Sequence, residues 1–268
     1  MRLSRVRDCT TTMLKAALID LDGTMVRAHL ELTPCVRSAV RRLAERIPVS
    51  IVSSRDHIVV RRFSEEIGLS ALQISEGGAR IFDPTTGDTP WFKPFERADA
   101  EAITGYLDKH GHAYSGVDGD KAINSTAEIR EWRVSRVTAI SLTPERAKEI
   151  GALFGKMQGV HASLIVRIDN GEWMVDFTHA DATKETAVVR YAELMRLDPS
   201  DVAGIGDSYN DLPLLNACGL RVAMGNAAPE LKAIAHYVAP TVDEDGLAVA
   251  IDEYLIPLLD TPGEGEVC

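Results

Sequence analysis

Short apolar runs alternate with amphipathic helical stretches at both ends of this 268-residue chain, and the middle of the chain lacks that rhythm. Residues 15–21 (KAALIDL) and 49–52 (VSIV) are apolar enough for strands buried on both faces, and a helical pattern follows each of them. The same alternation returns near residue 184. Strand–helix repeats of this kind predict an open parallel sheet with helices on both of its faces.

Local signals place the elements of this repeating part. Thr33 is a suitable N-cap for a helix to residue 44, with Pro34 at the first helical position, and Gly68 ends a second helix. A third strand is predicted near residues 72–75. After the middle of the chain we expect a helix over 184–195, a strand over 202–205, a helix over 211–217 and a strand over 221–223.

The middle of the chain begins at a cluster of turn residues, 83–88 (DPTTGD). The elements expected there are helices over 98–109 and 144–157, an irregular Gly-rich segment over 113–125, a strand over 134–142, and a hairpin with strands over 164–168 and 172–177 around Asp169-Asn170-Gly171. The predicted fold is therefore α/β, a Rossmann-like parallel-sheet core with an inserted α+β cap domain. Residues 1–82 and 179–268 form the predicted core, and residues 83–178 form the predicted cap.

Composition narrows the function classes. A formal net charge of −11 disfavours nucleic-acid binding, and no apolar stretch reaches the ~20 residues of a membrane span. The basic N-terminus has no apolar segment behind it, so we expect no secretory signal; residues 1–13 are a predicted short lead and 261–268 a loose tail. The four cysteines lack metal-ligand spacing, which predicts a reduced cytoplasmic protein without zinc. The oligomeric state is not indicated.

Acidic residues follow two of the predicted strands. Asp20-Leu21-Asp22-Gly23-Thr24 comes directly after the first strand, and Gly206-Asp207-Ser208-Tyr209-Asn210-Asp211 follows the strand over 202–205. Either segment alone is explained as a strand-end turn or a helix cap. Ser53 at a third strand end and Lys184 at a helix start complete a different set: oxygen ligands for a divalent cation, with a hydroxyl and an ammonium for a phosphoryl group.

The whole set resembles the haloacid-dehalogenase-like (HAD) phosphohydrolase superfamily. Asp20-x-Asp22-Gly-Thr is similar to its first motif, Ser53 to its second, Lys184 to its third, and Gly206-Asp207-x-x-Asn210-Asp211 to its fourth. The resemblance implies a magnesium-dependent phosphatase that forms an aspartyl-phosphate intermediate. It makes Asp20 the nucleophile, Asp22 the general acid/base, Ser53, Lys184 and Asn210 the phosphate-binding residues, and Asp20, the backbone carbonyl of Asp22, Asp207 and Asp211 the Mg²⁺ site.

The position of the insert resembles one branch of this superfamily, the Cof-like or sugar-phosphatase branch, whose large α+β cap lies between the second and third motifs. The stretch 74–79 (ISEGGA) fits that branch as well. Ser53-Ser54-Arg55 departs from the Thr-Gly-Arg that is frequent there. Serine keeps the hydroxyl, whereas Ser54 in place of glycine leaves the role of Arg55 open. Specificity is expected to come from cap residues that face the core, and the sequence does not identify which residues these are.

Several functions remain compatible with these residues. A small phosphorylated metabolite is the expected partner, with a sugar phosphate first, and phosphoglycolate, a phosphorylated cofactor or a nucleotide as alternatives. A phosphomutase would use the same pair of aspartates. A receiver domain would also place aspartates near a lysine, but Asp22 has no use in a site that preserves its phospho-aspartate, and a cap would be unexplained. The complete motif set argues against an inactive binding protein.

Overall fold

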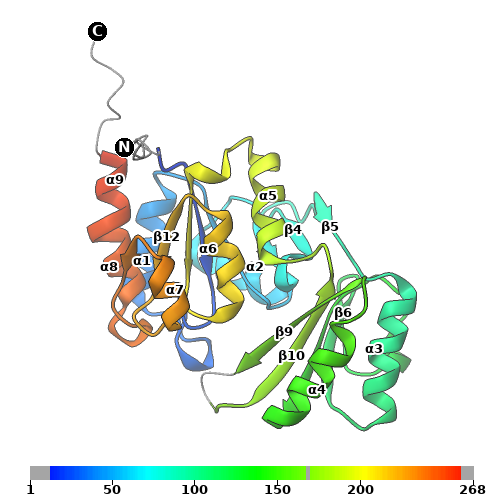
Figure 1. Ribbon diagram of the computed structural model, residues 1–268. Helices are drawn as coiled ribbons and strands as arrows, with labels where there is room; N and C mark the ends of the chain where they lie inside the picture. Colours follow the sequence, from blue (N-terminus) through cyan, green and yellow to red (C-terminus); the bar gives the residue numbers. More distant parts are fainter. Residues whose placement is uncertain (1–12, 167–169, 261–268) are drawn as a thin grey trace, which may run out of the picture.

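The computed structural model describes residues 13–166 and 170–260, which form two β-sheets (Figure 1). Segments from both ends of the chain form an eight-stranded sheet, and the middle of the chain forms a five-stranded sheet. The predicted fold class, a parallel α/β core with an inserted α+β cap, is confirmed. The expected N-terminal lead, the expected loose tail and Asp169 of the expected hairpin turn lie outside the described residues.

The core sheet has the strand order β13-β12-β11-β1-β2-β3-β4-β5, and its strands from β13 to β3 run parallel. These strands are β1 (Ala16–Asp20), β2 (Val49–Val52), β3 (Gln73–Ser75), β4 (Arg80–Phe82), β5 (Trp91–Phe92), β11 (Val202–Gly206), β12 (Leu220–Ala223) and β13 (Tyr237–Val238). Every residue of β1, β2 and β11 is buried, which explains their unbroken apolar sequences. β4 and β5 extend the sheet in antiparallel fashion, which the sequence pattern does not predict.

Helices cover both faces of the core sheet (Figure 1). They are α1 (Pro34–Ala44), α2 (His57–Ile67), α5 (Lys184–Met195), α6 (Leu212–Ala217), α7 (Pro229–Ile234), α8 (Gly246–Ala250) and α9 (Ile256–Asp260). The predicted cap of α1 is confirmed, because the Thr33 side chain accepts a hydrogen bond from the backbone N–H of Val36 and Pro34 occupies the first turn. Gly68 ends α2 with φ of 89°, a left-handed conformation that glycine adopts without strain.

The cap is an antiparallel sheet with two helices on one face. Its elements are α3 (Arg97–Lys109), β6 (Tyr114–Asp118), β7 (Lys121–Ile123), β8 (Val134–Leu142), α4 (Pro144–Phe154), β9 (Val160–Val166) and β10 (Trp173–His179), with the strand order β7-β6-β8-β10-β9. The expected irregular segment over 113–125 is wrong: it is the β6–β7 hairpin, whose Asp118 carboxylate accepts three backbone N–H groups. The expected helix over 144–157 ends early, at Phe154.

The two chain segments that join the cap to the core pack against each other. A short 3₁₀ turn (η2, Glu76–Gly78) follows β3, and a Cβ atom at Gly78 would overlap the carbonyl oxygen of Thr183 in the second linker. The fully buried Glu76 carboxylate lies 3.0 Å from His57 Nδ1 and 3.1 Å from Arg80 Nε. Arg80 also reaches the cap turn, where Asp120 accepts from it at 2.8 Å. A charged network therefore ties the linker region to both domains.

Neither cysteine of the described part, Cys35 or Cys218, forms a disulfide. Cys218 is buried in the core cluster, and Cys35 is exposed. Among the helices of residues 13–166 and 170–260, none has the length and apolar character that crossing a lipid bilayer requires.

Candidate active site

Three strands of the core deliver the predicted site residues to one edge of the sheet. Asp20 is the last residue of β1, Ser53 follows β2, and Asp207 follows β11. Because β1 pairs in parallel with both β2 and β11, the carboxyl ends of the three strands lie side by side. This edge is where open parallel sheets bind ligands.

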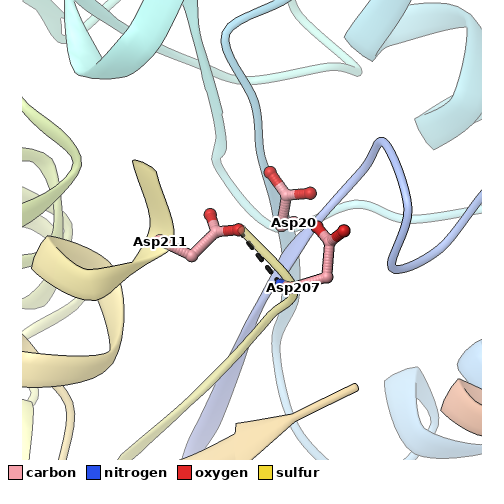
Figure 2. A group of neighbouring side chains, drawn as sticks. All are labelled: Asp20, Asp207 and Asp211. Carbon is pink, nitrogen blue, oxygen red and sulfur yellow. Dashed lines mark hydrogen bonds between the residues drawn. The ribbon is translucent and has the colours of Figure 1, made fainter. Parts of the chain in front are cut away.

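Asp20, Asp207 and Asp211 form a buried group of carboxylates (Figure 2). One oxygen of each lies within 4.8 Å of the other two, and their side chains come from two strand ends and from the turn that follows β11. The residues are only 5%, 6% and 0% exposed, respectively. Burial of three like charges so close together is costly without nearby positive charge.

Lys184 supplies part of that positive charge. It is the first residue of α5, behind the N-cap Thr183, and its Nζ donates to Asp20 Oδ1 at 2.5 Å and to Asp211 Oδ1. Burial by itself lowers the pKa of Lys184, but the carboxylates of Asp20 and Asp211 raise it above its ordinary value, so the ammonium stays charged. One ammonium against three carboxylates leaves two negative charges, which is the charge that a divalent cation would balance.

Burial and the excess negative charge raise the pKa values of two of these carboxyl groups. Burial raises the pKa of Asp207 to about 7, and the Asp211 carboxylate adds to the increase. Burial and Asp211 also raise the pKa of Asp20 well above its usual value, although Lys184 opposes the change. A metal ion bound to these oxygens would lower the pKa values of the carboxyl groups. An all-oxygen donor set with excess negative charge suits a hard divalent ion such as Mg²⁺ or Ca²⁺.

The turn after β11 is both a helix cap and part of the site. Asp211 Oδ2 accepts backbone N–H groups from Asp207 at 3.1 Å and from Ser208 at 3.0 Å, in a capping box with Ser208. The Ser208 hydroxyl donates to Asn210 Oδ1, and Asn210 lines the adjoining cavity. Asp211 therefore uses one oxygen to shape the turn and the other to hold Lys184.

The residues of the second motif, Ser53-Ser54-Arg55, line the same cavity as Asp20 and Asp207, and Arg55 forms an ion pair with Asp22. Its Nε and Nη2 donate to the two carboxylate oxygens of Asp22 at 3.1 and 2.8 Å, a bidentate pair that fixes the Asp22 side chain. The Ser53 hydroxyl oxygen accepts the backbone N–H of Arg55 at 3.0 Å. The hydroxyl proton of Ser53 thus remains to be donated to another oxygen.

Two residues that the sequence argument does not assign to the site hold Asp207 in place. Asn226 Nδ2 donates to Asp207 Oδ2 at 3.1 Å and to the carbonyl of Gly23 at 2.9 Å, and Thr24 Oγ1 donates to Asp207 Oδ1 at 3.4 Å. Asn226 therefore connects the first-motif loop to the fourth motif. Only its place in the stretch Gly225-Asn226-Ala227 after a predicted strand could have drawn attention to it.

A cavity of about 570 Å³ lies between this edge of the core and the cap sheet. Five predicted site residues line it: Asp20, Asp22, Ser53, Asp207 and Asn210. Lys184, which donates to Asp20 and to Asp211, and Asp211 itself are not part of the lining. The structure thus brings all seven predicted residues together, five at the cavity wall and two buried behind it.

A cap residue that the sequence does not reveal completes the wall. Arg136 of β8 donates from Nη1 to the backbone carbonyl of Ser54, and its Nε donates to Asp176 Oδ1 at 2.8 Å. The cap thereby contacts the second-motif loop of the core. Because Arg136 and Asp176 are 40 residues apart on neighbouring strands, no local pattern pairs them.

Comparisons with known proteins find relatives that match most of the chain. The profile of the family described as haloacid dehalogenase-like hydrolase matches residues 17–251. The stress response protein YhaX of Bacillus subtilis is 43% identical, and the alignment covers 88% of this chain and 91% of that protein. A phosphoglycolate phosphatase of Methanothrix thermoacetophila is 25% identical, with 90% of this chain and 96% of that protein covered.

Solved structures share the fold as well. A haloacid dehalogenase-like hydrolase from B. subtilis superposes with a TM-score of 0.78 at 22% identity, covering 90% of this chain and 100% of the other. At that identity the likeness concerns the fold. It includes the parallel core and the antiparallel cap sheet that lies between the second and third motifs.

Proposed function

Because this chain belongs to the haloacid dehalogenase-like hydrolases and is a phosphatase of that family, we propose that it hydrolyses a small phosphorylated metabolite through a phospho-aspartate on Asp20. The observation that carries this proposal is the buried group of Asp20, Asp207 and Asp211 with Lys184, at the edge of the core sheet that faces the cavity. A carboxylate held beside an ammonium and open to a ligand-sized cavity is suited to attack a phosphoryl group.

The reaction has two steps. In the first, an Asp20 oxygen bonds to phosphorus while the bond from phosphorus to the leaving oxygen breaks, and Asp22 donates a proton to that oxygen. In the second, water attacks the phosphorus of the acyl phosphate, Asp22 accepts a proton from the water, and the Asp20 carboxylate is restored as phosphate leaves. Both side chains line the cavity. The pair with Arg55 positions Asp22 as a carboxylate, the form that accepts a proton in the second step, and Asp22 must give up one of these two contacts to carry the proton that it donates in the first.

Three residues would orient the phosphoryl oxygens. The Ser53 hydroxyl has its proton free of the bond that its oxygen accepts from Arg55, so it can donate to the phosphate. The Lys184 ammonium lies beside Asp20, where negative charge on the transferring group must be balanced. Asn210 lies at the cavity wall next to Asp207, within the same turn.

Mg²⁺ is the cation we assign to the carboxylates. Asp20, the backbone carbonyl of Asp22 and Asp207 would hold it, and Asp211 would support the group, since both Asp211 oxygens already accept hydrogen bonds. The all-oxygen donors and the two unbalanced charges fit such an ion. When bound, it would supply positive charge against the phosphoryl oxygens.

We further propose a division of labour in which residues 1–82 and 179–268 carry out the chemistry and residues 83–178 read the body of the substrate. A sugar phosphate is the leading substrate, and phosphoglycolate is an alternative that one relative's name supports. The phosphatase names among the relatives favour hydrolysis over a phosphomutase or a receiver domain. A reduced, cytoplasmic location stays a prediction.

Hydrolysis of p-nitrophenyl phosphate tests the metal and the carboxylate group together. We expect activity to disappear in a chelator and to return with Mg²⁺, because the carboxylates need a cation to accept a phosphate beside them. Asp207→Asn should be inactive, whereas Asp201→Asn, whose carboxylate pairs with Lys15 away from the cavity, should retain activity. Full activity in chelator, or in Asp207→Asn, would contradict the proposal.

A further inference from the structure

The cap sheet presents two chemically different faces. Val137, Ala139, Val175 and Phe177 belong to the hydrophobic cluster beneath α3 and α4. The alternate residues of the same strands, among them Arg136, Thr138 and Ile140 of β8 and Met174 and Asp176 of β10, line the cavity instead. Side chains alternate along a strand, so the face that meets the core is built separately from the face that stabilises the cap.

On the cavity face, the residues beside the second-motif loop are polar. Arg136 contacts the Ser54 carbonyl of the core, and the next row consists of Ser115, Thr138 and Asp176, which pair across β6, β8 and β10. Thr138 Oγ1 donates to Asp176 Oδ1 at 2.5 Å. The row therefore offers hydrogen-bonding groups to whatever lies between the phosphate and the rest of the substrate.

These polar residues carry no unbalanced positive charge. Each of the three arginines that line the cavity is paired with a carboxylate: Arg27 with Asp245, Arg55 with Asp22 and Arg136 with Asp176, each at 2.8 Å. A second anionic group on the substrate, such as the carboxylate of phosphoglycolate, would have to compete with an existing ion pair and would lose its hydration. The pairing favours a substrate whose body is neutral.

A second row on this face is apolar, and β9, which carries part of it, contacts the turn η5 (Tyr209–Asp211) of the core. Ile140 lies four residues beyond Arg136, roughly 13 Å along the strand, and Met174 pairs directly with Ile165 of β9. In the described part of the chain, Ile140, Ile165 and Met174 belong to neither hydrophobic cluster, although all three are large and apolar. Their side chains face the cavity rather than a packed core.

The core contributes an apolar side chain to the same cavity. Leu30 lines it from the short turn η1 (Ala28–Leu30), in which His29 and Leu30 have φ of 58° and 59°. Left-handed backbone at two consecutive non-glycine residues is uncommon and costs free energy, so the surrounding structure must hold it. Such strain is typical of loops that position a side chain for a ligand.

We propose that the substrate is a phosphomonoester with an uncharged, hydroxyl-bearing linker and a terminal apolar or aromatic group, which lies against Leu30, Ile140, Ile165 and Met174. This inference rests on the proposed function, because the phosphate must sit at Asp20. The linker faces Thr138 and Asp176, so a sugar or polyol unit suits that position. A substrate as short as phosphoglycolate would reach neither row fully and would leave much of the 570 Å³ cavity to water.

Three synthetic esters separate these features: butyl phosphate, 4-phenylbutyl phosphate and 4-carboxybutyl phosphate. Their leaving alkoxides are nearly equal in basicity, so differences in kcat/KM report contacts with the body of the ester. We expect kcat/KM for 4-phenylbutyl phosphate to exceed kcat/KM for butyl phosphate by at least about 10-fold, because the apolar row would bury the ring. The carboxylate ester should be the poorest of the three.

Matched variants locate the effect. Ile165→Asp should lower the ratio of kcat/KM for the phenyl and butyl esters by about 10-fold, with Met174→Ser as a milder second variant if the first folds poorly. Leu164→Asp should leave the ratio unchanged, because Leu164 is 44% exposed and lies beside Gly151 of α4 on the opposite face. A thermal melt of each variant shows whether it is folded.

The outcomes distinguish this inference from the function on which it rests. Equal kcat/KM for the butyl and phenylbutyl esters, preference for the carboxylate ester, or equal effects of Leu164→Asp and Ile165→Asp would overturn the assignment of the apolar row. In those cases hydrolysis by a Mg²⁺-dependent phosphatase would still stand. If no phosphomonoester, including p-nitrophenyl phosphate, is hydrolysed with Mg²⁺ present, the proposed function itself fails.

Discussion

Removal of the Lys184 ammonium should destabilise the protein far more than removal of an exposed lysine in an equally short ion pair. Lys184→Met keeps the apolar stem but leaves Asp20 and Asp211 without the cation that both contact. The lysine side chain is 3% exposed and those of the two aspartates are 7% and 0% exposed, so solvent cannot replace the lost charge. The variant buries carboxylates whose charge is no longer balanced.

The expected size follows from this burial. Loss of one partner from a buried ion pair typically costs about 3–5 kcal/mol. For a protein of this size each 1 kcal/mol lowers Tm by roughly 2–4 °C, so the metal-free variant should melt roughly 6–20 °C below the parent. Mg²⁺ should recover part of the loss, because a cation bound only by the folded state stabilises it. The rise in Tm on addition of Mg²⁺ should therefore be larger for the variant than for the parent.

Lys15→Met is the matched control. Lys15 Nζ lies 2.6 Å from Asp201 Oδ2, but the lysine side chain is 47% exposed, and pairs of that kind contribute about 0–1 kcal/mol. Differential scanning calorimetry in a chelator, with and without later addition of Mg²⁺, measures both variants. If Lys184→Met and Lys15→Met lose the same stability, or if Mg²⁺ has no larger effect on Lys184→Met than on the parent, the reasoning about the buried charges is wrong.

Two further predictions concern residues around the site. Glu76→Gln should lower stability at pH 7 by roughly 3 kcal/mol, because His57 and Arg80 lose their buried carboxylate. Burial raises the pKa of Glu76, but His57 and Arg80 outweigh it and hold that pKa below its ordinary value. The stabilisation by the Glu76 carboxylate is therefore fully present above the ordinary pKa and is lost as the pH falls through the lowered pKa. The urea unfolding midpoints of parent and variant should converge as the medium becomes acidic. Asn226→Ala removes the donor that holds Asp207, and the Mg²⁺ concentration for half-maximal activity should rise about 10–100-fold, the usual cost of losing a partner that orients a metal ligand. An unchanged Mg²⁺ requirement would mean that Asn226 does not position Asp207.

The core of the site can be predicted from the sequence because parallel strands end at the same edge. Once residues 15–21, 49–52 and 202–205 are identified as neighbouring buried strands, Asp20, Ser53 and Asp207 must lie close together. The helix ends at Thr33 and Gly68 can be predicted as well, since each helix end depends on a few adjacent residues. Local signals and strand direction together determine this half of the molecule.

The cap side of the site depends on contacts between distant residues. Alternation in β8 indicates that the strand has two faces, but only the docking of the cap decides that Arg136 meets Ser54 and pairs with Asp176. The local sequence does not predict the β6–β7 hairpin, because its strands are short and the Asp118 carboxylate that supports it accepts backbone N–H groups from Arg130, Glu131 and Arg133. Both features require the tertiary structure.

The most direct measurement of the central claim is the site of phosphorylation during turnover. The Asp22→Asn variant should accumulate phosphoenzyme from p-nitrophenyl phosphate with Mg²⁺, because this leaving group departs without a proton and hydrolysis of the acyl phosphate is slowed by ~100-fold or more. Rapid acid quench and mass spectrometry should find one phosphate on the peptide that contains Asp20, and Asp20→Asn should give none. Phosphate on another residue, or equal absence of phosphoenzyme in both variants, would contradict the assignment of Asp20 as the nucleophile.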